Sequence, residues 1–388
     1  MKLIQDFKIM SGQIQMVDLK GQYEKIKESI DSAILETLSS TQFINGPQVK
    51  TFAQNLADYT GAKHVIPCAN GTDALQIALM ALDLKPGDEI ICPSFTYVAT
   101  AEVIGLLGLT TVMADVDPNT FNITADLIQP LINSKTKAIV PVHLYGQSCD
   151  MEGILKLAKK HGLFVIEDNA QAIGAKYTFL DGTVQNTGTM GDIGTTSFFP
   201  SKNLGCYGDG GAIFTNNDKL AVKLRMIANH GQEVKYYHKV IGCNSRLDSI
   251  QASILDIKLK YLDEYSAARN QMASEYDKAF SMIEGLEIPK RQVNSTHVFH
   301  QYTLKTKPEL RDRIICHLKE RGIPAMIYYP VPLYKQEAFS RYVETEFEIP
   351  NVESLCESVF SLPIHTEIES SNQDYIIQEV QNFFEMNK

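Results

Sequence analysis

The chain has 388 residues, of which 44% are hydrophobic and 21% charged, so it can bury a sizeable core in about two or three domains. Its net charge of −10, with no run rich in lysine or arginine, argues against a nucleic-acid surface. The most apolar stretch, residues 103–116, is interrupted by Thr110, Thr111 and Asp115 and is shorter than the roughly 18 residues of a membrane-spanning helix. Residues 1–15 lack the long apolar core of a secretion signal, so we expect a cytoplasmic protein with an N-terminal extension.

Short apolar runs alternate with helical patterns up to residue 215. This alternation is typical of an α/β fold with a mostly parallel sheet flanked by helices. Seven runs are expected to form its strands, at residues 65–67, 89–92, 111–116, 138–142, 163–167, 195–199 and 211–215.

After Asp248 the pattern changes to one long helix, from residue 249 to about 272. Beyond it, residues 302–305 and 325–329 have strand patterns and residues 311–321 and 374–385 have helical patterns, which predicts a smaller α+β domain. We therefore expect a large domain at 1–250, followed at 251–388 by the connector helix and a small C-terminal domain.

The first motif with chemical meaning is the strand, tight turn and helix at residues 65–82. Gly71 permits close backbone approach, Thr72 adds a hydroxyl, and the free N–H groups of the new helix attract a phosphate. The glycine and lysine spacings of nucleotide-binding loops are missing. By itself the motif is weak, because many such junctions use Gly-Thr only as a helix cap.

An apolar run at residues 163–168 ends in two carboxylates, and Asp168 is placed where open α/β sheets bind ligands. An aspartate there can pair with the ring nitrogen of pyridoxal phosphate, keeping the ring protonated as an electron sink. Gln171 follows closely enough to contact the phenolic oxygen of the same ring. Taken alone, Asp168 is about as well explained as a helix cap.

Lys202 follows the expected strand at 195–199 and precedes a glycine-dense turn at 205–211. A rigid, partly dehydrated setting lowers the pKa of a lysine and leaves its amine nucleophilic, ready to form an imine. A lysine on a glycine-rich hairpin is the simpler interpretation of this segment alone. The combination with Asp168 favours the imine, and Ser197 adds a hydroxyl for the phosphate.

Seven cysteines are scattered along the chain without a Cys-x-x-Cys pair, and the nine histidines do not cluster with them. We therefore expect reduced thiols in the core and no metal site.

Six segments, 68–75, 93–102, 142–146, 166–171, 198–205 and 244–248, resemble the DegT-type sugar aminotransferases. The resemblance extends from about residue 16 to the C-terminus. These enzymes are a branch of the fold-type I pyridoxal-phosphate family and act on nucleotide-linked keto sugars. The resemblance implies a homodimer with shared active sites.

The same resemblance assigns roles to individual residues. Cofactor binding is implied for Lys202, which forms the imine, and for Asp168, Gln171, Gly71, Thr72, Ser197, Tyr97 and Asn244. Contacts on the substrate side are implied for Arg246, Tyr328 and Tyr329, with Asn244 and Arg246 reaching in from the other subunit. Two positions depart from the family pattern: Asn169 stands where relatives carry a small residue, and Tyr328 where many have histidine.

The expected reaction is amination of a keto group, at C3, of a nucleotide-linked sugar for bacterial surface polysaccharides such as the O-antigen of lipopolysaccharide. Glutamate is the expected donor, leaving 2-oxoglutarate. UDP-2-acetamido-2-deoxy-3-oxo-glucuronic acid is the first choice of substrate and a dTDP-3-oxo-6-deoxyhexose the alternative. A sugar dehydratase that uses the same cofactor, or a non-catalytic regulator on the same fold, is a weaker interpretation because Lys202 and Asp168 are both present.

Overall fold

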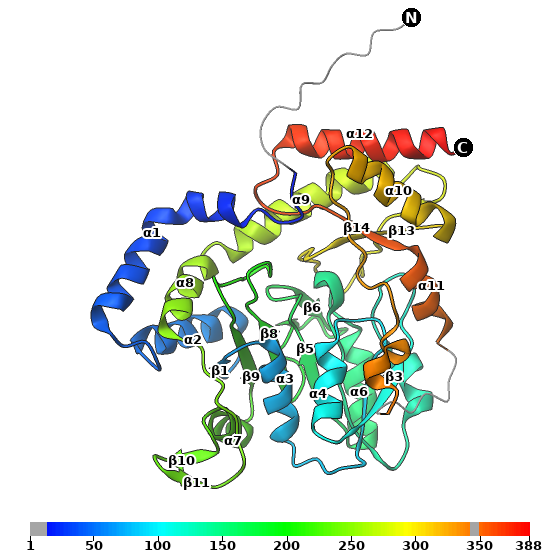
Figure 1. Cartoon of the computed structure of the whole chain (residues 1–388). Coiled ribbons are helices and arrows are strands. Elements are labelled where there is room, and N and C mark those ends of the chain that lie inside the picture. The colour runs from blue at the N-terminus through cyan, green and yellow to red at the C-terminus, as the bar shows by residue number, and fades with distance from the viewer. Residues whose placement is uncertain (1–13, 342–348) are drawn as a thin grey trace, which may run out of the picture.

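A seven-stranded sheet forms the centre of the computed structural model, which describes residues 14–341 and 349–388 (Figure 1). Most of the expected N-terminal extension, residues 1–13, lies outside the described residues. The strand order is β1-β9-β8-β5-β4-β2-β3. The strands are β1 His64–Cys68, β2 Glu89–Pro93, β3 Thr110–Ala114, β4 Thr136–Ile139, β5 Phe164–Asp168, β8 Ile193–Ser197 and β9 Gly211–Thr215.

Only β9 runs against its neighbours in this sheet, since it pairs antiparallel with both β1 and β8 while all other pairs are parallel. The predicted seven-stranded, mostly parallel sheet is therefore confirmed, with all seven runs in it. The carboxyl ends of β5 and β8 lie side by side, because Asp168 pairs with Thr195. This edge of the sheet is where the candidate residues gather.

Helices cover both faces of the sheet, and neighbouring residues of β2 show the alternation. Ile90 packs in one core cluster with side chains of α3 (Gly71–Met80), α4 (Ala99–Leu106) and α7 (Asp218–Ala228). Ile91 packs in another with side chains of α6 (Met151–His161) and α11 (Pro350–Ser358). A strand buried on both faces reads as a continuous apolar run, which explains why the sequence signal was clear.

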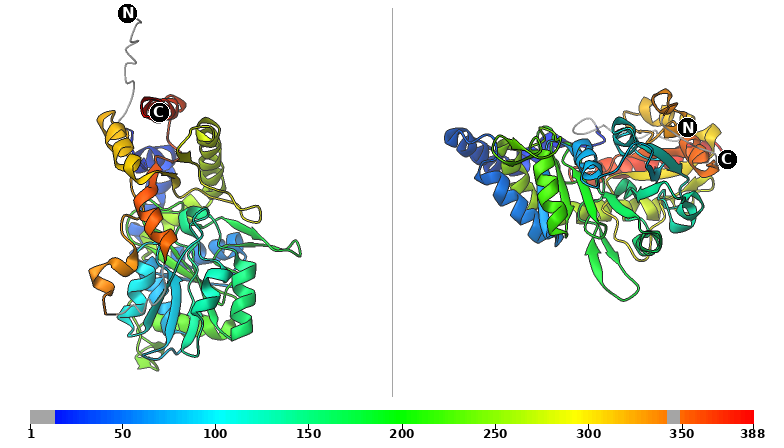
Figure 2. Two further views of the ribbon diagram at one scale, coloured as in Figure 1. Left: turned by 90° about the vertical axis from the view of Figure 1, so that its right-hand side faces the viewer. Right: turned by 90° about the horizontal axis from the view of Figure 1, so that it is seen from below.

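A second, antiparallel sheet of β12 (Leu286–Glu287), β13 (Tyr302–Thr306) and β14 (Val359–Leu362) has its own apolar core. Helices α9 (Leu262–Phe280), α10 (Pro308–Glu320) and α12 (Ser370–Met386) contribute to that core. Figure 1 and the left view of Figure 2 both place α12, in red, at one end of the molecule. The domain boundary at residue 250 stays a prediction.

Two local predictions were wrong. Residues 249–272 form two helices, α8 (Ser249–Leu259) and α9 (Leu262–Phe280), because the amides of Lys260 and Tyr261 bond to carbonyls three residues back and tighten the turn. Residues 325–329 are not a strand. Only Met326 forms an isolated bridge, to Ser361, and the segment then turns towards the large sheet.

The remaining elements are short or peripheral. They are α1 Leu19–Ser40, α2 Pro47–Thr60, α5 Ala125–Ile128, the 3-10 turns Gln129–Leu131, Leu144–Gly146, Leu333–Lys335 and Glu337–Phe339, and the hairpins β6 Lys176–Thr178 with β7 Val184–Asn186 and β10 Gln232–Val234 with β11 Tyr237–His238.

All seven cysteines are free thiols; five are buried as predicted, whereas Cys243 is half-buried and Cys316 is exposed. Within the described ranges, no helix combines the length and apolar character needed to cross a membrane.

Candidate active site

Lys202 lies in the loop that joins β8 to β9, at the carboxyl end of β8. Its backbone N–H donates to the carbonyl of Phe199 at 2.8 Å, and the amide of Cys206 donates back to the carbonyl of Phe198 at 2.8 Å, so the loop is held at both ends. Burial lowers the pKa of Lys202 to about 8, although the carboxylate of Asp168 partly opposes this shift. The side chain therefore has the dehydrated setting that the sequence predicted for an imine-forming lysine.

Asp168 is the last residue of β5 and is almost fully buried, with 5% of its surface exposed. One carboxylate oxygen accepts from the Thr100 hydroxyl at 2.7 Å, and the other accepts from the Ala170 N–H at 3.1 Å. These bonds fix the direction of the carboxylate at the edge of the sheet. Its charge acts on Lys202, so the two predicted residues face the same space.

Gln171 is held by both ends of its amide. Its carbonyl oxygen accepts from the Tyr145 N–H at 2.7 Å, and its NH₂ group donates to the Tyr329 hydroxyl at 3.0 Å. One hydrogen of this NH₂ group remains free to donate to the phenolic oxygen of a ligand ring, since the group forms no other bond among the described residues. Burial raises the pKa of Tyr329, which therefore stays a neutral phenol.

The start of helix α3 forms a cradle beside the end of β8. The Asn70 side chain caps the helix by accepting from the Asp73 N–H at 2.8 Å. The N–H groups of Gly71 and Thr72 make no hydrogen bond within the described part of the chain. A Cβ at Gly71 would lie 2.7 Å from the Cβ of Ser197, so only glycine lets the two segments approach this closely.

Three tyrosines lie on the outer side of this space. The Tyr97 side chain is 57% exposed, and its ring centroid is 6.4 Å from that of Tyr329 at a tilt of 46°. Tyr328 precedes Tyr329 in the chain, and the backbone carbonyl of Tyr328 accepts from the Tyr145 hydroxyl. Tyr329 thus joins Tyr97 and Tyr328 into one aromatic group, with the Tyr328 and Tyr329 ring centroids 6.1 Å apart.

Asn244 and Arg246 lie elsewhere in the chain. Arg246 lines a cavity of about 520 Å³ together with Asn45, Lys50 and Arg225, and Asn244 is exposed beside it. Among the described residues, no hydrogen bond or ion pair joins either side chain to the site at Lys202. Within the described part of one chain neither side chain bonds to the other predicted residues, although Ser245 between them accepts from the Ala69 N–H at 3.0 Å, close to the start of α3.

The residues present fit pyridoxal phosphate. A buried amine with a lowered pKa faces a buried carboxylate, and an amide hydrogen is available at Gln171. The unpaired N–H groups at the start of α3 lie beside the hydroxyl of Ser197, which suits a phosphate.

Sequence reasoning missed three partners of the site. Thr100 lies inside one of the quoted segments, yet its bond to Asp168 spans 68 positions in the sequence and has no local signal. Tyr145 orients Gln171 through a backbone N–H, and its positive φ of 58° is a property of the fold rather than of the residue type. Asn203, beside Lys202, donates to the carbonyl of Val298 at 2.9 Å and thereby ties the lysine loop to the approach of the second sheet.

Comparison with known proteins agrees with this geometry. The model of the DegT/DnrJ/EryC1/StrS aminotransferase family matches residues 24–381. A pleiotropic regulatory protein from Geobacillus stearothermophilus is 44% identical over 96% of this chain and 98% of its own. A UDP-2-acetamido-2-deoxy-3-oxo-D-glucuronate aminotransferase from Pseudomonas aeruginosa is 45% identical over 92% of this chain and 97% of its own. The solved structure of ntda from Bacillus subtilis with bound cofactor PMP has a TM-score of 0.88 at 30% identity, covering 97% of this chain and 86% of its own.

Asp168→Asn is expected to lower the pH at which Lys202 becomes reactive. A neighbouring carboxylate favours the ammonium form, so its removal moves the pKa of Lys202 below about 8. The cofactor-free protein is mixed with pyridoxal phosphate at a series of pH values, and the rate of capture is followed by absorbance. The pH at which this rate is half of its maximum is the capture midpoint of Lys202. Asp115→Asn is the matched control, because Asp115 is also a buried carboxylate that accepts backbone N–H groups. An unchanged midpoint in Asp168→Asn would contradict the pairing.

Proposed function

This chain belongs to the DegT/DnrJ/EryC1/StrS aminotransferase family, and on that basis we propose that it transfers an amino group from glutamate to the C3 keto group of a nucleotide-linked sugar. The observation that carries the proposal is the buried amine of Lys202, with a pKa of about 8, opposite the buried carboxylate of Asp168. An amine with that pKa changes its protonation state close to neutral pH, which is what a proton carrier requires.

Pyridoxal phosphate is the cofactor of this family, and when bound it supplies a ring that withdraws electrons from the reacting carbon. In our proposal Asp168 holds a proton on the ring nitrogen, and its bond from Thr100 keeps the carboxylate turned in that direction. Gln171 donates to the ring oxygen. The N–H groups of Gly71 and Thr72 and the hydroxyl of Ser197 bind the phosphate.

Lys202 has two tasks in this proposal. Its Nζ first anchors the cofactor and then yields that position to the amino group of the donor. The freed Nζ would take the proton from the substrate carbon and return it on the cofactor side; one water would then release 2-oxoglutarate, and the amino group would stay with the cofactor. The keto sugar then passes through the same steps in reverse, with Lys202 again holding the mobile proton.

Arg246 gives the physical reason for choosing a uronic acid as the sugar. A guanidinium binds a carboxylate by two parallel hydrogen bonds, so it can hold the glutamate carboxylate first and a sugar carboxylate second. The P. aeruginosa relative is named for a substrate of this class. We therefore propose UDP-2-acetamido-2-deoxy-3-oxo-glucuronic acid, with a dTDP-3-oxo-6-deoxyhexose as the alternative.

A homodimer would bring Asn244 and Arg246 to a neighbouring site. Both residues lie away from Lys202 in their own chain, next to the β10–β11 hairpin. Tyr236, 78% exposed, and Ile241, 87% exposed, are large apolar groups on that same region. Apolar surface of this kind is suited to contact with another protein surface.

The cytoplasm as the location and bacterial surface polysaccharide synthesis as the process remain predictions.

The decisive experiment is an assay of the purified protein with glutamate and a panel of nucleotide keto sugars. A change in visible absorbance on addition of glutamate supports an aminotransferase. A protein that binds the cofactor without this change would be a regulator on the same fold, as the name of the G. stearothermophilus relative suggests for that protein.

Lys202→Ala is expected to lower the rate of transamination by several orders of magnitude while leaving the fold intact, because it removes both the anchor of the cofactor and the proton carrier. Borohydride reduction of the wild-type protein loaded with the cofactor, followed by peptide mass mapping, locates the attachment. A pyridoxyl adduct on another lysine would refute the assignment.

Mixing two inactive variants tests the shared site. Lys202→Ala and Arg246→Ala should each be inactive alone, whereas mixed dimers should regain activity because one of their two sites has both residues intact. Subunit exchange is verified with differently tagged chains. Full exchange without recovered activity would contradict the contribution of Arg246 to the partner's site.

The substrate proposal predicts a preference for the uronic acid over its 6-deoxy analogue by well over tenfold in kcat/KM. Removing the carboxylate partner of a buried guanidinium typically costs about 2–5 kcal/mol of binding free energy. Arg246→Lys should impair both half-reactions, since an ammonium cannot make the paired contact. Equal kcat/KM values for the two sugars would remove the reason for choosing the uronate.

A further inference from the structure

The second carboxylate of the 163–168 run, Glu167, takes no part in the mechanism above, yet it is fully buried. One oxygen accepts from the N–H groups of Met190 and Gly191, each at 2.6 Å. The other accepts from the Gly188 N–H at 2.8 Å and from His143 Nε2 at 2.9 Å. Four donors use all the accepting positions that a carboxylate has, so the charge is held without any water.

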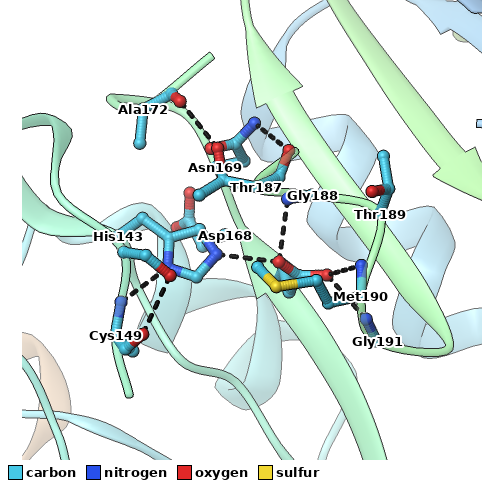
Figure 3. Close-up of polar contacts among 12 residues, drawn as sticks. His143, Cys149, Asp168, Asn169, Ala172, Thr187, Gly188, Thr189, Met190 and Gly191 are labelled. Atoms are coloured by element: carbon cyan, nitrogen blue, oxygen red, sulfur yellow. Dashed lines mark hydrogen bonds and ion pairs between the residues drawn. The ribbon is translucent and has the colours of Figure 1, made fainter. Parts of the chain in front are cut away.

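The hydrogen bonds of His143 identify its tautomer. Its Nδ1 accepts from the Cys149 N–H at 3.1 Å (Figure 3), so the ring hydrogen is on Nε2, which lies 2.9 Å from a carboxylate oxygen of Glu167. A neutral imidazole thus serves as one of the four donors. Among the described residues, the Glu167 carboxylate is bonded to dipoles and to no lysine or arginine.

The three backbone donors belong to one turn, residues 187–191, which is pressed against β5 and β8. A Cβ on Gly194 of β8 would lie 1.9 Å from the carbonyl oxygen of Gly188, and a Cβ on Gly191 would lie 2.7 Å from that of Val165. Two glycines are therefore needed for the turn to reach Glu167.

Asn169, the residue that follows Asp168 in the chain, binds the same turn. Its Nδ2 donates to the carbonyl of Thr187 at 3.0 Å, as Figure 3 shows. Its Oδ1 is buried without a hydrogen-bond partner. Leaving a buried oxygen without a partner destabilises the folded protein. The Nδ2 bond to Thr187 offsets this cost, and it accounts for an asparagine at a position where the family pattern has a small residue.

Successive side chains of an extended strand point to opposite faces, and this connects the turn to the site. Glu167 and Asn169 both bind residues 187–191, so Asp168 between them must face the other way, towards Thr100 and Lys202. We propose that Glu167 and Asn169 are positioning residues that fix the direction of the Asp168 carboxylate by holding this turn behind it. This inference rests on the role proposed above for Asp168.

Glu167→Gln is the direct test. An NH₂ group cannot accept, so at least one buried donor of the turn or of His143 loses its partner. In the cofactor-free protein, amide hydrogen exchange at Gly188, Met190 and Gly191 should accelerate by at least about tenfold. The capture midpoint of Lys202 should fall in the same direction as in Asp168→Asn, because a carboxylate that has turned away supports the ammonium less. His300, whose pKa is lowered by burial and by the nearby charge of Lys202, is unchanged in this comparison.

With the cofactor restored, kcat/KM should fall by at least about tenfold. Asp115→Asn should leave the turn's exchange rates and the midpoint as in wild type. A folded Glu167→Gln protein with a wild-type midpoint, while Asp168→Asn is shifted, would overturn this inference and leave the role of Asp168 standing. An unshifted Asp168→Asn would instead overturn that role.

Asn169→Ala decides the matter if Glu167→Gln does not fold, because it removes a single hydrogen bond and leaves the carboxylate in place. A smaller fall of the midpoint in the same direction supports the positioning role. A folded Asn169→Ala protein with wild-type exchange at Gly188 and a wild-type midpoint would refute it.

Discussion

The candidate site depends on one electrostatic constraint, which is that the amine of Lys202 and the carboxylate of Asp168 share a space with little water. Burial alone favours the neutral amine, and the carboxylate pulls the pKa of Lys202 back up, so the balance is reached at about 8. Two further contacts hold these two groups in place. Thr100 orients the carboxylate, and the bond from Asn203 to Val298 holds the lysine loop.

The topology of the sheet explains how the two groups meet. Parallel neighbours need a long crossover, whereas antiparallel neighbours can be joined by a loop. Because β9 is the one antiparallel strand of the seven-stranded sheet, a loop at the carboxyl edge of β8 is enough to connect the two strands, and Lys202 lies in that loop. β5 ends at the same edge with Asp168. A helical crossover after β8 would have carried the chain away from that edge.

The sequence predicted those features that depend on local pattern. The seven strands and the positions of Lys202 and Asp168 at strand ends follow from apolar runs and the residues that close them. The partners of these residues could not be predicted, because Thr100 and Tyr145 are brought in by tertiary folding from distant segments. The error at 325–329 has the same origin. That segment has strand composition, but its backbone and aromatic rings are engaged by the large sheet's core.

Two adjacent carboxylates at the end of one strand would be expected to repel each other, and the structure separates their roles by the way each is neutralised. Glu167 is satisfied by three backbone N–H groups and a neutral imidazole, so it has no need of a cation. In the part of the chain that the structure describes, the Asp168 carboxylate accepts two bonds, both from neutral donors, and so retains the capacity to hold a proton on a ligand. The difference between the two faces of β5 thus leaves Asp168 as the carboxylate able to attract positive charge at the site.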